Sequence, residues 1–300
     1  MYRKIIVGYD GSDQSEDALA LGALIAGESD ARLVVAGVLQ FDPIWGVRYP
    51  AFQQAEVDFS RQIEQAAASV GAEAETITST SAGRGLHELA EELAADLIVI
   101  GSPHRGRVGQ AVAGSVAMSL LHGSPCSVGV APRGYSEGGE RRITEIAVGV
   151  DGSDEARMAL DEAVELARAG GVPIKLIAVA ELPSVTYGKS GPAGGRGLEE
   201  AIEETMRRQL GGATESVPGD VRVEPVLATG EPAATLAELA RADGALLMLG
   251  SRSYGPLRRV LLGSVSAALA RSAPCPLIVH PRPAKAPARG RPPVAAASVL

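Results

Sequence analysis

The stretch Ile5-Ile6-Val7-Gly8-Tyr9-Asp10-Gly11-Ser12 returns later in the chain as Ile146-Ala147-Val148-Gly149-Val150-Asp151-Gly152-Ser153. Each copy begins with an aliphatic run that is typical of a buried strand and ends with an Asp-Gly-Ser turn. Further motifs recur in the same order: Gly101-Ser102 as Gly250-Ser251, Gly114-Ser115-Val116 as Gly263-Ser264-Val265, Pro125-Cys126 as Pro274-Cys275, and Pro132-Arg133 as Pro281-Arg282. The sequence therefore predicts two copies of one domain.

Strand-like runs alternate with longer helical patterns in both copies. This alternation predicts right-handed crossovers and a parallel sheet in each copy. The expected fold class is α/β, with two tandem five-stranded parallel open sheets, helices on both faces and a Rossmann-like topology. The expected strands are 4–9, 32–39, 73–79, 96–101 and 127–131, then 145–150, 174–180, 222–227, 245–250 and 277–280. The expected helices of the first copy are 14–27, 52–70, 86–94 and 115–121.

The repeat also sets the domain boundaries. We place the first domain at residues 1–133, a polar, Gly-rich linker at 134–142 and the second domain at 143–282. The Pro/Ala/Arg-rich tail at 283–300 has no acidic residue and no periodicity, so we expect it to be disordered. The offset between the copies grows from 141 (146 − 5) to 149 (250 − 101), so the second copy holds eight extra residues, which we place within 183–197.

The composition narrows the class of protein. Apolar residues make up 46% of the 300 residues and aromatic residues 3%, so each core must be aliphatic. The net charge of −8 disfavours nucleic acid as a partner. No signal peptide and no membrane-spanning run is visible, so we expect a cytoplasmic protein with no membrane partner. Cys126 and Cys275 lie at equivalent positions, and we expect buried free thiols rather than a disulfide.

Repeated polar signals fall at the ends of the first and fourth strands of each copy. In an open parallel sheet, ligands bind beyond the carboxyl ends of the strands where the strand order reverses. Asp-Gly-Ser follows the first strand, Gly-Ser ends the fourth, and a second Gly-Ser opens the last helix. A helix start offers N–H groups to an anion, and glycine lets the backbone approach a phosphate. The pattern therefore indicates a site for adenine and phosphates in each copy.

The stretches 101–116 and 250–266 are very similar to the motif Gly-x2-Gly-x9-Gly-Ser/Thr. That motif belongs to ATP-binding members of the universal stress protein family, a family whose Val-x-x-Asp-Gly-Ser start and late Pro-Cys pair are also present. Over residues 1–282 the chain thus resembles a tandem-domain bacterial universal stress protein. The resemblance implies a stress-response protein with a fold similar to that of the adenine nucleotide alpha hydrolases.

The resemblance also implies the site residues. In the second domain, Asp151 and the backbone at Val179 would hold adenosine. Its phosphate-binding residues would be Gly250, Ser251, Ser253, Gly263, Ser264 and Val265. The first-domain counterparts are Asp10, Val38, Gly101, Ser102, Gly114, Ser115 and Val116. The implied ligand is ATP, with or without Mg²⁺. No protein-bound metal is expected, because the histidines and cysteines lack the spacing of metal ligands.

Both copies depart from the motif at its middle glycine, which is His104 in the first and Ser253 in the second. If that glycine has positive φ, a side chain there costs about 1–2 kcal/mol. Binding would weaken about tenfold per 1.4 kcal/mol and survive. A histidine facing the phosphates could instead block entry, so we favour the second domain as the nucleotide site.

Several readings without nucleotide remain open. Asp10 and Asp151 could serve only the turn or the helix cap, and Ser115 and Ser264 could be N-caps alone. A scaffold or interaction protein of the same family is the second hypothesis, and the missing middle glycines favour it. An enzyme that cleaves ATP between its α- and β-phosphates would carry a Ser-Gly-Gly-x-Asp-Ser loop, where this chain has 10–15. A response-regulator receiver would need an acidic cluster that is absent from the sequence.

Two short motif matches and a pair of aromatic residues give weaker indications of function than the repeated motifs. The stretch 134–138 fits the nucleophile-elbow pattern but lies in the linker, with no helix expected after it. The stretch 188–190 resembles the end of a P-loop, yet position 183 is proline where the first glycine belongs. Trp45 and Tyr49 are interpreted as core cover, with a lid over the crevice as the alternative.

The sequence therefore predicts a protein that is not an enzyme, with weak ATP hydrolysis left open, because no general base, nucleophile or metal triad stands out. Its two domains are expected to pack as an intramolecular pseudo-dimer. Related single domains pair through the last strand, so 127–131 and 277–280 are the expected contact. A homodimer of the whole chain also remains open.

Overall fold

The fold is seen in a computed structural model of the chain. The structure describes residues 1–40, 50–102, 115–138, 141–182, 191–251, 263–272 and 274–281. The expectations for Trp45, Tyr49, His104, Gly114, Ser253, 188–190 and the tail at 283–300 fall outside the described residues.

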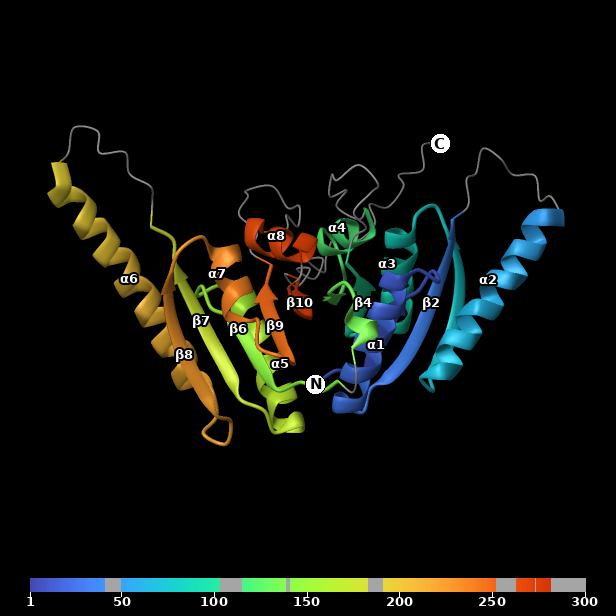
Figure 1. The fold of residues 1–300 in the computed structure, drawn as a ribbon, viewed down its shortest axis with the longest axis horizontal. Helices are drawn as coiled ribbons and strands as arrows, with labels where there is room; N and C mark the ends of the chain where they lie inside the picture. The colour runs from blue at the N-terminus through green and yellow to red at the C-terminus, as the bar shows by residue number, and fades with distance from the viewer. Residues whose placement is uncertain are drawn as a thin grey trace, which may run out of the picture.

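The first domain alternates strands and helices along the chain (Figure 1). Its elements are β1 (Lys4–Gly8), α1 (Asp13–Ser29), β2 (Arg32–Gln40), α2 (Pro50–Ser69), β3 (Glu73–Ser79), α3 (Ala82–Leu93), β4 (Leu97–Gly101), α4 (Ser115–Leu121) and β5 (Ser127–Ala131).

The second domain repeats this order after a short 3₁₀ helix, η2 (Tyr135–Glu137). Its elements are β6 (Glu145–Gly149), α5 (Asp154–Gly170), β7 (Ile174–Ala180), α6 (Gly191–Ser216), β8 (Val223–Thr229), α7 (Pro232–Leu239), β9 (Ala245–Gly250), α8 (Ser264–Ser272) and β10 (Leu277–His280).

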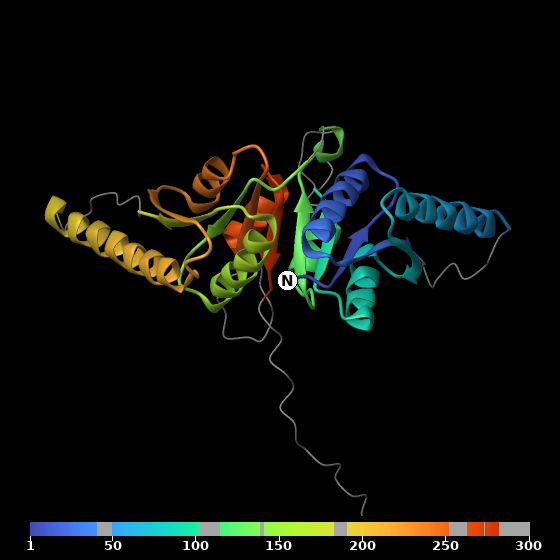
Figure 2. The same cartoon turned by 90° about the horizontal axis from the view of Figure 1, so that it is seen from below.

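The two five-stranded sheets join edge to edge into one ten-stranded sheet, in the order β3-β2-β1-β4-β5-β10-β9-β6-β7-β8. Strand pairs within each domain are parallel, and the order reverses between β1 and β4 and between β6 and β9. The domains meet at β5 and β10, which pair antiparallel with Gly129 opposite Ile278. Figure 2 shows these two strands side by side at the centre of the molecule. The α/β fold class is confirmed, and the last strands pair with each other as expected.

Helices cover both faces of the sheet, and both cores are aliphatic. On one face α1, α2, α5 and α6 bury residues such as Leu21, Ile63 and Leu166 against the strands. On the other face α3, α4, α7 and α8 bury residues such as Leu89 and Leu269. Each of these clusters contains residues of both domains. The core is therefore continuous across the junction between the domains.

The repeated Asp-Gly-Ser segments form the turns between β1 and α1 and between β6 and α5. Gly11 and Gly152 have φ of +80° and +76°, a backbone conformation that favours glycine. The serine that follows is the N-cap: Ser12 Oγ accepts from Ser15 N at 3.3 Å, and Ser153 Oγ accepts from Ala156 N at 3.1 Å. Because an N-cap satisfies an otherwise unpaired N–H, these serines fix where α1 and α5 begin.

Two features add detail that the sequence did not give. Helix α6 has 26 residues against 20 for α2, so most of the extra length of the second copy lengthens this helix. The linker is anchored to the first domain, because the buried Asp17 carboxylate of α1 accepts from Gly134 N at 2.9 Å and from Ser136 N at 2.6 Å. Ser136 Oγ also donates to Asp17, at 2.8 Å.

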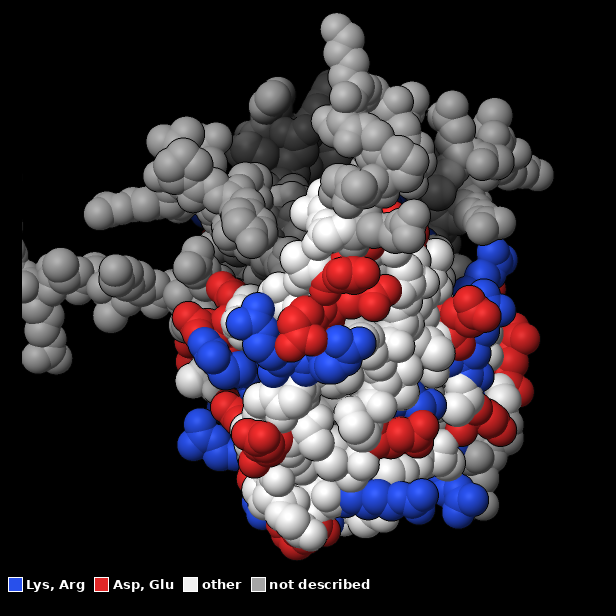
Figure 3. Space-filling view, turned by 90° about the vertical axis from the view of Figure 1, so that its left-hand side faces the viewer, with Lys and Arg blue, Asp and Glu red and all other residues white. Residues whose placement is uncertain are grey.

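Acidic and basic side chains are interspersed on the end of the molecule formed by the second domain (Figure 3). Ion pairs such as Arg168 with Asp220 and Arg207 with Glu204 account for part of this mixing. Among the described residues, this face carries no broad basic surface of the kind that binds a phosphate backbone. Among the described residues, none of the helices is both long and apolar enough to cross a membrane.

Candidate functional site

A cavity of about 680 Å³ lies at the carboxyl ends of β6, β7 and β9, beside the point where the strand order of the second domain reverses. The structure brings six of the eight expected second-domain residues to its wall: Asp151, Val179, Gly250, Gly263, Ser264 and Val265. They come from three strand ends and from the start of α8. Residues up to 114 positions apart (265 − 151) thus share one cavity because parallel strands end at the same edge.

The other two expected residues are not seen on this wall. Ser251 is 1% exposed, and its N–H donates to His280 O at 2.8 Å. The Ser251 hydroxyl has no hydrogen-bond partner among the described residues. Ser253 lies outside them. Ser251 therefore does not reach the cavity through its side chain in this conformation.

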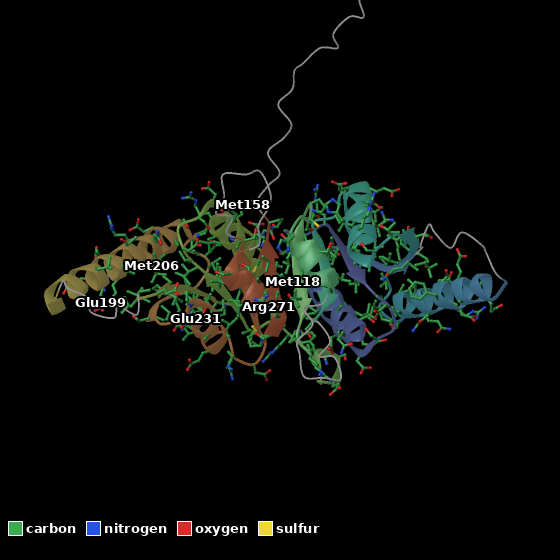
Figure 4. The ribbon with its side chains drawn as sticks, turned by 90° about the horizontal axis from the view of Figure 1, so that it is seen from above. Met118, Met158, Glu199, Met206, Glu231 and Arg271 are labelled. Atoms are coloured by element: carbon green, nitrogen blue, oxygen red, sulfur yellow. The ribbon has the colours of Figure 1, made fainter. Side chains whose placement is uncertain are left out.

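The wall also includes residues that sequence reasoning missed. Glu181 follows β7, and Ile202 and Met206 project from α6 (Met206 is labelled in Figure 4). Ser266, in the first turn of α8, donates from Oγ to Gly250 O at 3.2 Å. The i, i+4 spacing of Ile202 and Met206 was the available signal, since it places both on one face of a helix.

The first domain has a smaller cavity, of about 220 Å³, at the equivalent place. Of the expected residues, its wall includes Asp10, Val38, Gly101, Ser102 and Val116. Gly114 falls outside the described residues, and Ser115 begins α4 with a side chain that is not described. Where the second domain has Glu181 and Ser266, the first has Gln40 (181 − 141) and Ala117 (266 − 149).

The two aspartates shape the turns beside the cavities. Asp10 Oδ1 accepts from Ser12 N at 3.1 Å and from Ser12 Oγ at 2.5 Å. Asp151 Oδ1 accepts from Ser153 N at 2.9 Å and from Ser153 Oγ at 2.5 Å. Both side chains therefore stabilise the turn that precedes the helix.

Packing accounts for the glycines that end β4 and β9. A Cβ on Gly101 would lie 2.1 Å from Gln14 O, and a Cβ on Gly250 would lie 2.5 Å from Ala156 N. These atoms belong to the backbone of the first turns of α1 and α5, which cannot move aside as a side chain can. The family motif implies that these glycines let the backbone approach phosphate, but close packing of helix on strand already requires them.

We therefore expect Gly250→Ala to destabilise the protein by about 1–3 kcal/mol, the usual cost of forcing extra atoms into a packed site. The measurement is urea unfolding of the full chain. The matched control is Gly211→Ala in α6, where a new Cβ meets nothing within 4 Å. It should stabilise the protein by about 0.5–1 kcal/mol. An unchanged midpoint for Gly250→Ala would contradict the packing explanation.

The described residues do not provide what a metal site or a reactive thiol requires. The part of the chain that the structure describes has no group of three or more His, Cys, Asp or Glu placed to hold a metal ion. Cys126 and Cys275 are free and buried, as expected from the sequence. Burial raises the pKa of each thiol to about 11, so both stay protonated at neutral pH and are poor nucleophiles.

The model of the universal stress protein family matches the chain twice, over residues 1–132 and 143–281. The chain belongs to the universal stress protein family. The family membership expected from the repeated motifs is thus confirmed. A universal stress protein of Mycobacterium tuberculosis, Rv2319c, is 29% identical over 297 residues, covering 92% of this chain and 99% of that protein. A second one from the same species, Rv2005c, is 28% identical over 299 residues, covering 92% and 96%.

Solved structures of other universal stress proteins share the fold. The crystal structure of one from Archaeoglobus fulgidus matches with a TM-score of 0.60 at 18% identity, over 93% of this chain and 96% of that chain. A putative universal stress protein of Pseudomonas aeruginosa matches with a TM-score of 0.61 at 14% identity, over 93% and 94%. At these identities the likeness concerns the tandem architecture alone.

Proposed function

We propose that this universal stress protein binds an adenine nucleotide in the cavity of its second domain and acts as a regulatory or protective module in the stress response. The cavity is the observation that carries the proposal. It lies at the switch point between β6 and β9, where ligands of open parallel sheets bind. Its volume of about 680 Å³ falls within the range of small-molecule sites, about 300–1,000 Å³.

The cavity wall divides into an apolar part and a polar part, which suits a nucleotide. Ile177, Val179, Leu249, Ile202 and Met206 supply aliphatic surface for a flat base. The start of α8 supplies backbone N–H groups that have no carbonyl of their own helix to bond, together with the positive end of the helix dipole. Such a helix start favours phosphate. The Asp151 carboxylate can accept hydrogen bonds from ribose hydroxyls.

The two domains are not equivalent in this proposal. The first cavity, at about 220 Å³, is below the usual range for sites that enclose a drug-sized ligand. We therefore expect one nucleotide per chain, bound by the second domain. The described wall of that cavity holds no His, Lys or Cys. Accordingly, we assign no catalytic step to the site.

Calorimetric titration of the full chain with ATP tests the proposal. Asp151→Asn keeps an acceptor oxygen for the turn and removes the charge, so we expect its affinity to fall about tenfold through loss of a charge-assisted hydrogen bond. The matched control is Asp10→Asn, which makes the same change beside the smaller cavity and should leave affinity nearly unchanged.

Titrations with and without Mg²⁺ show whether the metal accompanies the nucleotide, and phosphate release measured in parallel tests for weak hydrolysis. No heat at millimolar ATP would favour the scaffold hypothesis. A loss of affinity caused by Asp10→Asn alone would move the site to the first domain.

A further inference from the structure

The β5–β10 junction between the domains has two ends, and the repeat relates the residues at one end to residues at the other. Val128 lies opposite Val279, and Val130 lies opposite Leu277. With the offset of 149, Val128 corresponds to Leu277 and Val130 to Val279, so exchanging the domains exchanges these pairs. Every residue at one end of the junction therefore has a counterpart at the other end. In a symmetric pair of identical domains, the two ends would have the same chemistry.

One end of the junction is polar. We call Tyr2, Ser127, Glu162 and His280 the polar quartet: the first two belong to the first domain and the last two to the second. Ser127 Oγ lies 3.1 Å from His280 Nδ1 across the β5–β10 pairing. His280 Nε2 lies 3.4 Å from Glu162 Oε2 of α5. Tyr2 faces the same carboxylate, and burial followed by the Glu162 charge raises the pKa of its phenol.

Three members of the polar quartet are almost removed from solvent, whereas the Glu162 side chain is 32% exposed. Tyr2, Ser127 and His280 are 2%, 4% and 1% exposed. The Tyr2 hydroxyl, Glu162 Oε2 and His280 Nε2 are buried atoms without a hydrogen bond of good geometry to the described residues. Such groups are costly in an apolar interior, so their placement at one interface calls for a compensating role.

At the opposite end of the junction, the four residues that correspond to the polar quartet are apolar. The counterparts of Tyr2 and Glu162 are Ile143 (2 + 141) and Leu21 (162 − 141), while those of His280 and Ser127 are Ala131 (280 − 149) and Pro276 (127 + 149). Leu21 and Ala131 are fully buried, and Ile143 is 8% exposed. The two copies therefore differ in polarity at the positions where the domains are in contact.

We propose that the polar quartet favours the pairing of β5 with β10. It disfavours the pairing of β5 with β5, or of β10 with β10, from a second chain. In a β5–β5 pairing, the repeat would place Ser127 against Ala131 and Tyr2 against Leu21 of the other copy. In a β10–β10 pairing, it would place His280 against Pro276 and Glu162 against Ile143. Either pairing buries polar groups opposite apolar ones at both ends, whereas the pairing of unlike domains collects them at one end.

This selection matters because β5 and β10 are both aliphatic edge strands. Unpaired edge strands associate readily with other chains. The apolar contacts along Val128, Val130, Leu277 and Val279 would fit a like pairing as well as an unlike one. Polar groups that face one another in only one of the two arrangements supply the discrimination, as a buried asparagine does in a coiled coil.

Three variants of the full chain test the proposal. The first, Tyr2→Ile with Ser127→Ala, removes the first-domain partners of Glu162 and His280 and leaves these two facing each other. The second, Glu162→Leu with His280→Ala, removes the second-domain partners of Tyr2 and Ser127. The third carries all four substitutions and makes the polar end resemble the apolar end. We expect the first variant to lose on the order of 5 °C in Tm, because the buried His280 imidazole loses the Ser127 hydroxyl and the Glu162 carboxyl no longer faces Tyr2.

The variant with all four substitutions separates selection from mere stability. Its Tm should recover to that of the wild type or above, since buried polar groups can be replaced by apolar ones at little cost. Its selectivity should be lost. Two differently labelled batches, unfolded in urea and refolded together at high concentration, should then form mixed oligomers about tenfold more often than the wild type, a ratio that corresponds to about 1.4 kcal/mol.

Fluorescence energy transfer between the labels, together with light scattering, measures this fraction. A rise in mixed oligomers at recovered Tm supports selection by the polar quartet. A fraction equal to that of the wild type overturns it, as does a Tm of the first variant that is unchanged.

Discussion

Val130→Pro is expected to break the junction between the domains and to lower the free energy of unfolding by more than about 3 kcal/mol. Val130 is fully buried and lies in β5, which pairs with β4 on one side and β10 on the other. Proline has no N–H to donate, and a strand with neighbours on both sides needs that N–H in its ladder. The substitution also removes a buried side chain from the core.

Urea unfolding measures the loss of stability, and small-angle X-ray scattering of the folded fraction measures separation of the domains as a larger radius of gyration. Ala74→Pro in the edge strand β3 is the matched control. The register of the second domain already has Pro225 at that position of its own edge strand, β8. The control should cost less than about 1 kcal/mol, because an edge position tolerates a missing donor. Equal effects of the two prolines would argue against β5 as the structural centre.

The repeat made most of the fold predictable from the sequence. Strands from aliphatic runs, helices between them and the pairing of the last strands all follow from local pattern and from the rules of parallel sheets. The strand ends are correct to within a residue or two: β1 ends at Gly8 rather than Tyr9, for example. The same rules predicted where the strand ends converge, and thus most of the cavity wall around Asp151 and Gly250.

The residues that the sequence did not reveal depend on tertiary packing. Ile202 and Met206 lie on the long helix α6. Their spacing shows that they share an apolar face of the helix, but it does not show that this part of the face lines the cavity. Asp17 lies within the expected helix 14–27 and in no motif, yet it is 1% exposed and anchors the linker. Gly250 was interpreted through a phosphate motif, whereas the close approach of α5 is visible only in three dimensions.

The polar quartet was missed for a different reason. The candidate site residues are those that recur in both copies, whereas Glu162 and His280 lie at positions where the two copies differ. Their counterparts Leu21 and Ala131 are ordinary core residues. In a duplicated protein, the residues that distinguish one domain from the other can therefore lie at positions where the two copies differ. A comparison of mismatched positions along the expected contact strands would have been the available signal.

His280 should make the stability of the protein depend on pH. Burial lowers the pKa of its imidazole to about 4, from an ordinary value near 6.5. Between these values the unfolded chain takes up a proton and the folded chain does not, so the contribution to stability is complete above pH 6.5 and is lost as the pH falls toward 4. At 1.36 kcal/mol for each pKa unit, acidification should remove about 3 kcal/mol through this group.

His280→Asn isolates this effect, because the amide can still meet Ser127 while it does not titrate. Burial raises the pKa of the neighbouring Glu162 carboxyl, which gives the opposite dependence, since the folded chain then gains a proton before the unfolded one. That contribution is shared by both proteins, so the difference between their unfolding free energies reports His280. The difference should shift by about 3 kcal/mol against the wild type between neutral pH and pH 4. A constant difference would mean that Glu162, 3.4 Å from the imidazole, holds the proton on His280 and offsets the cost of burial.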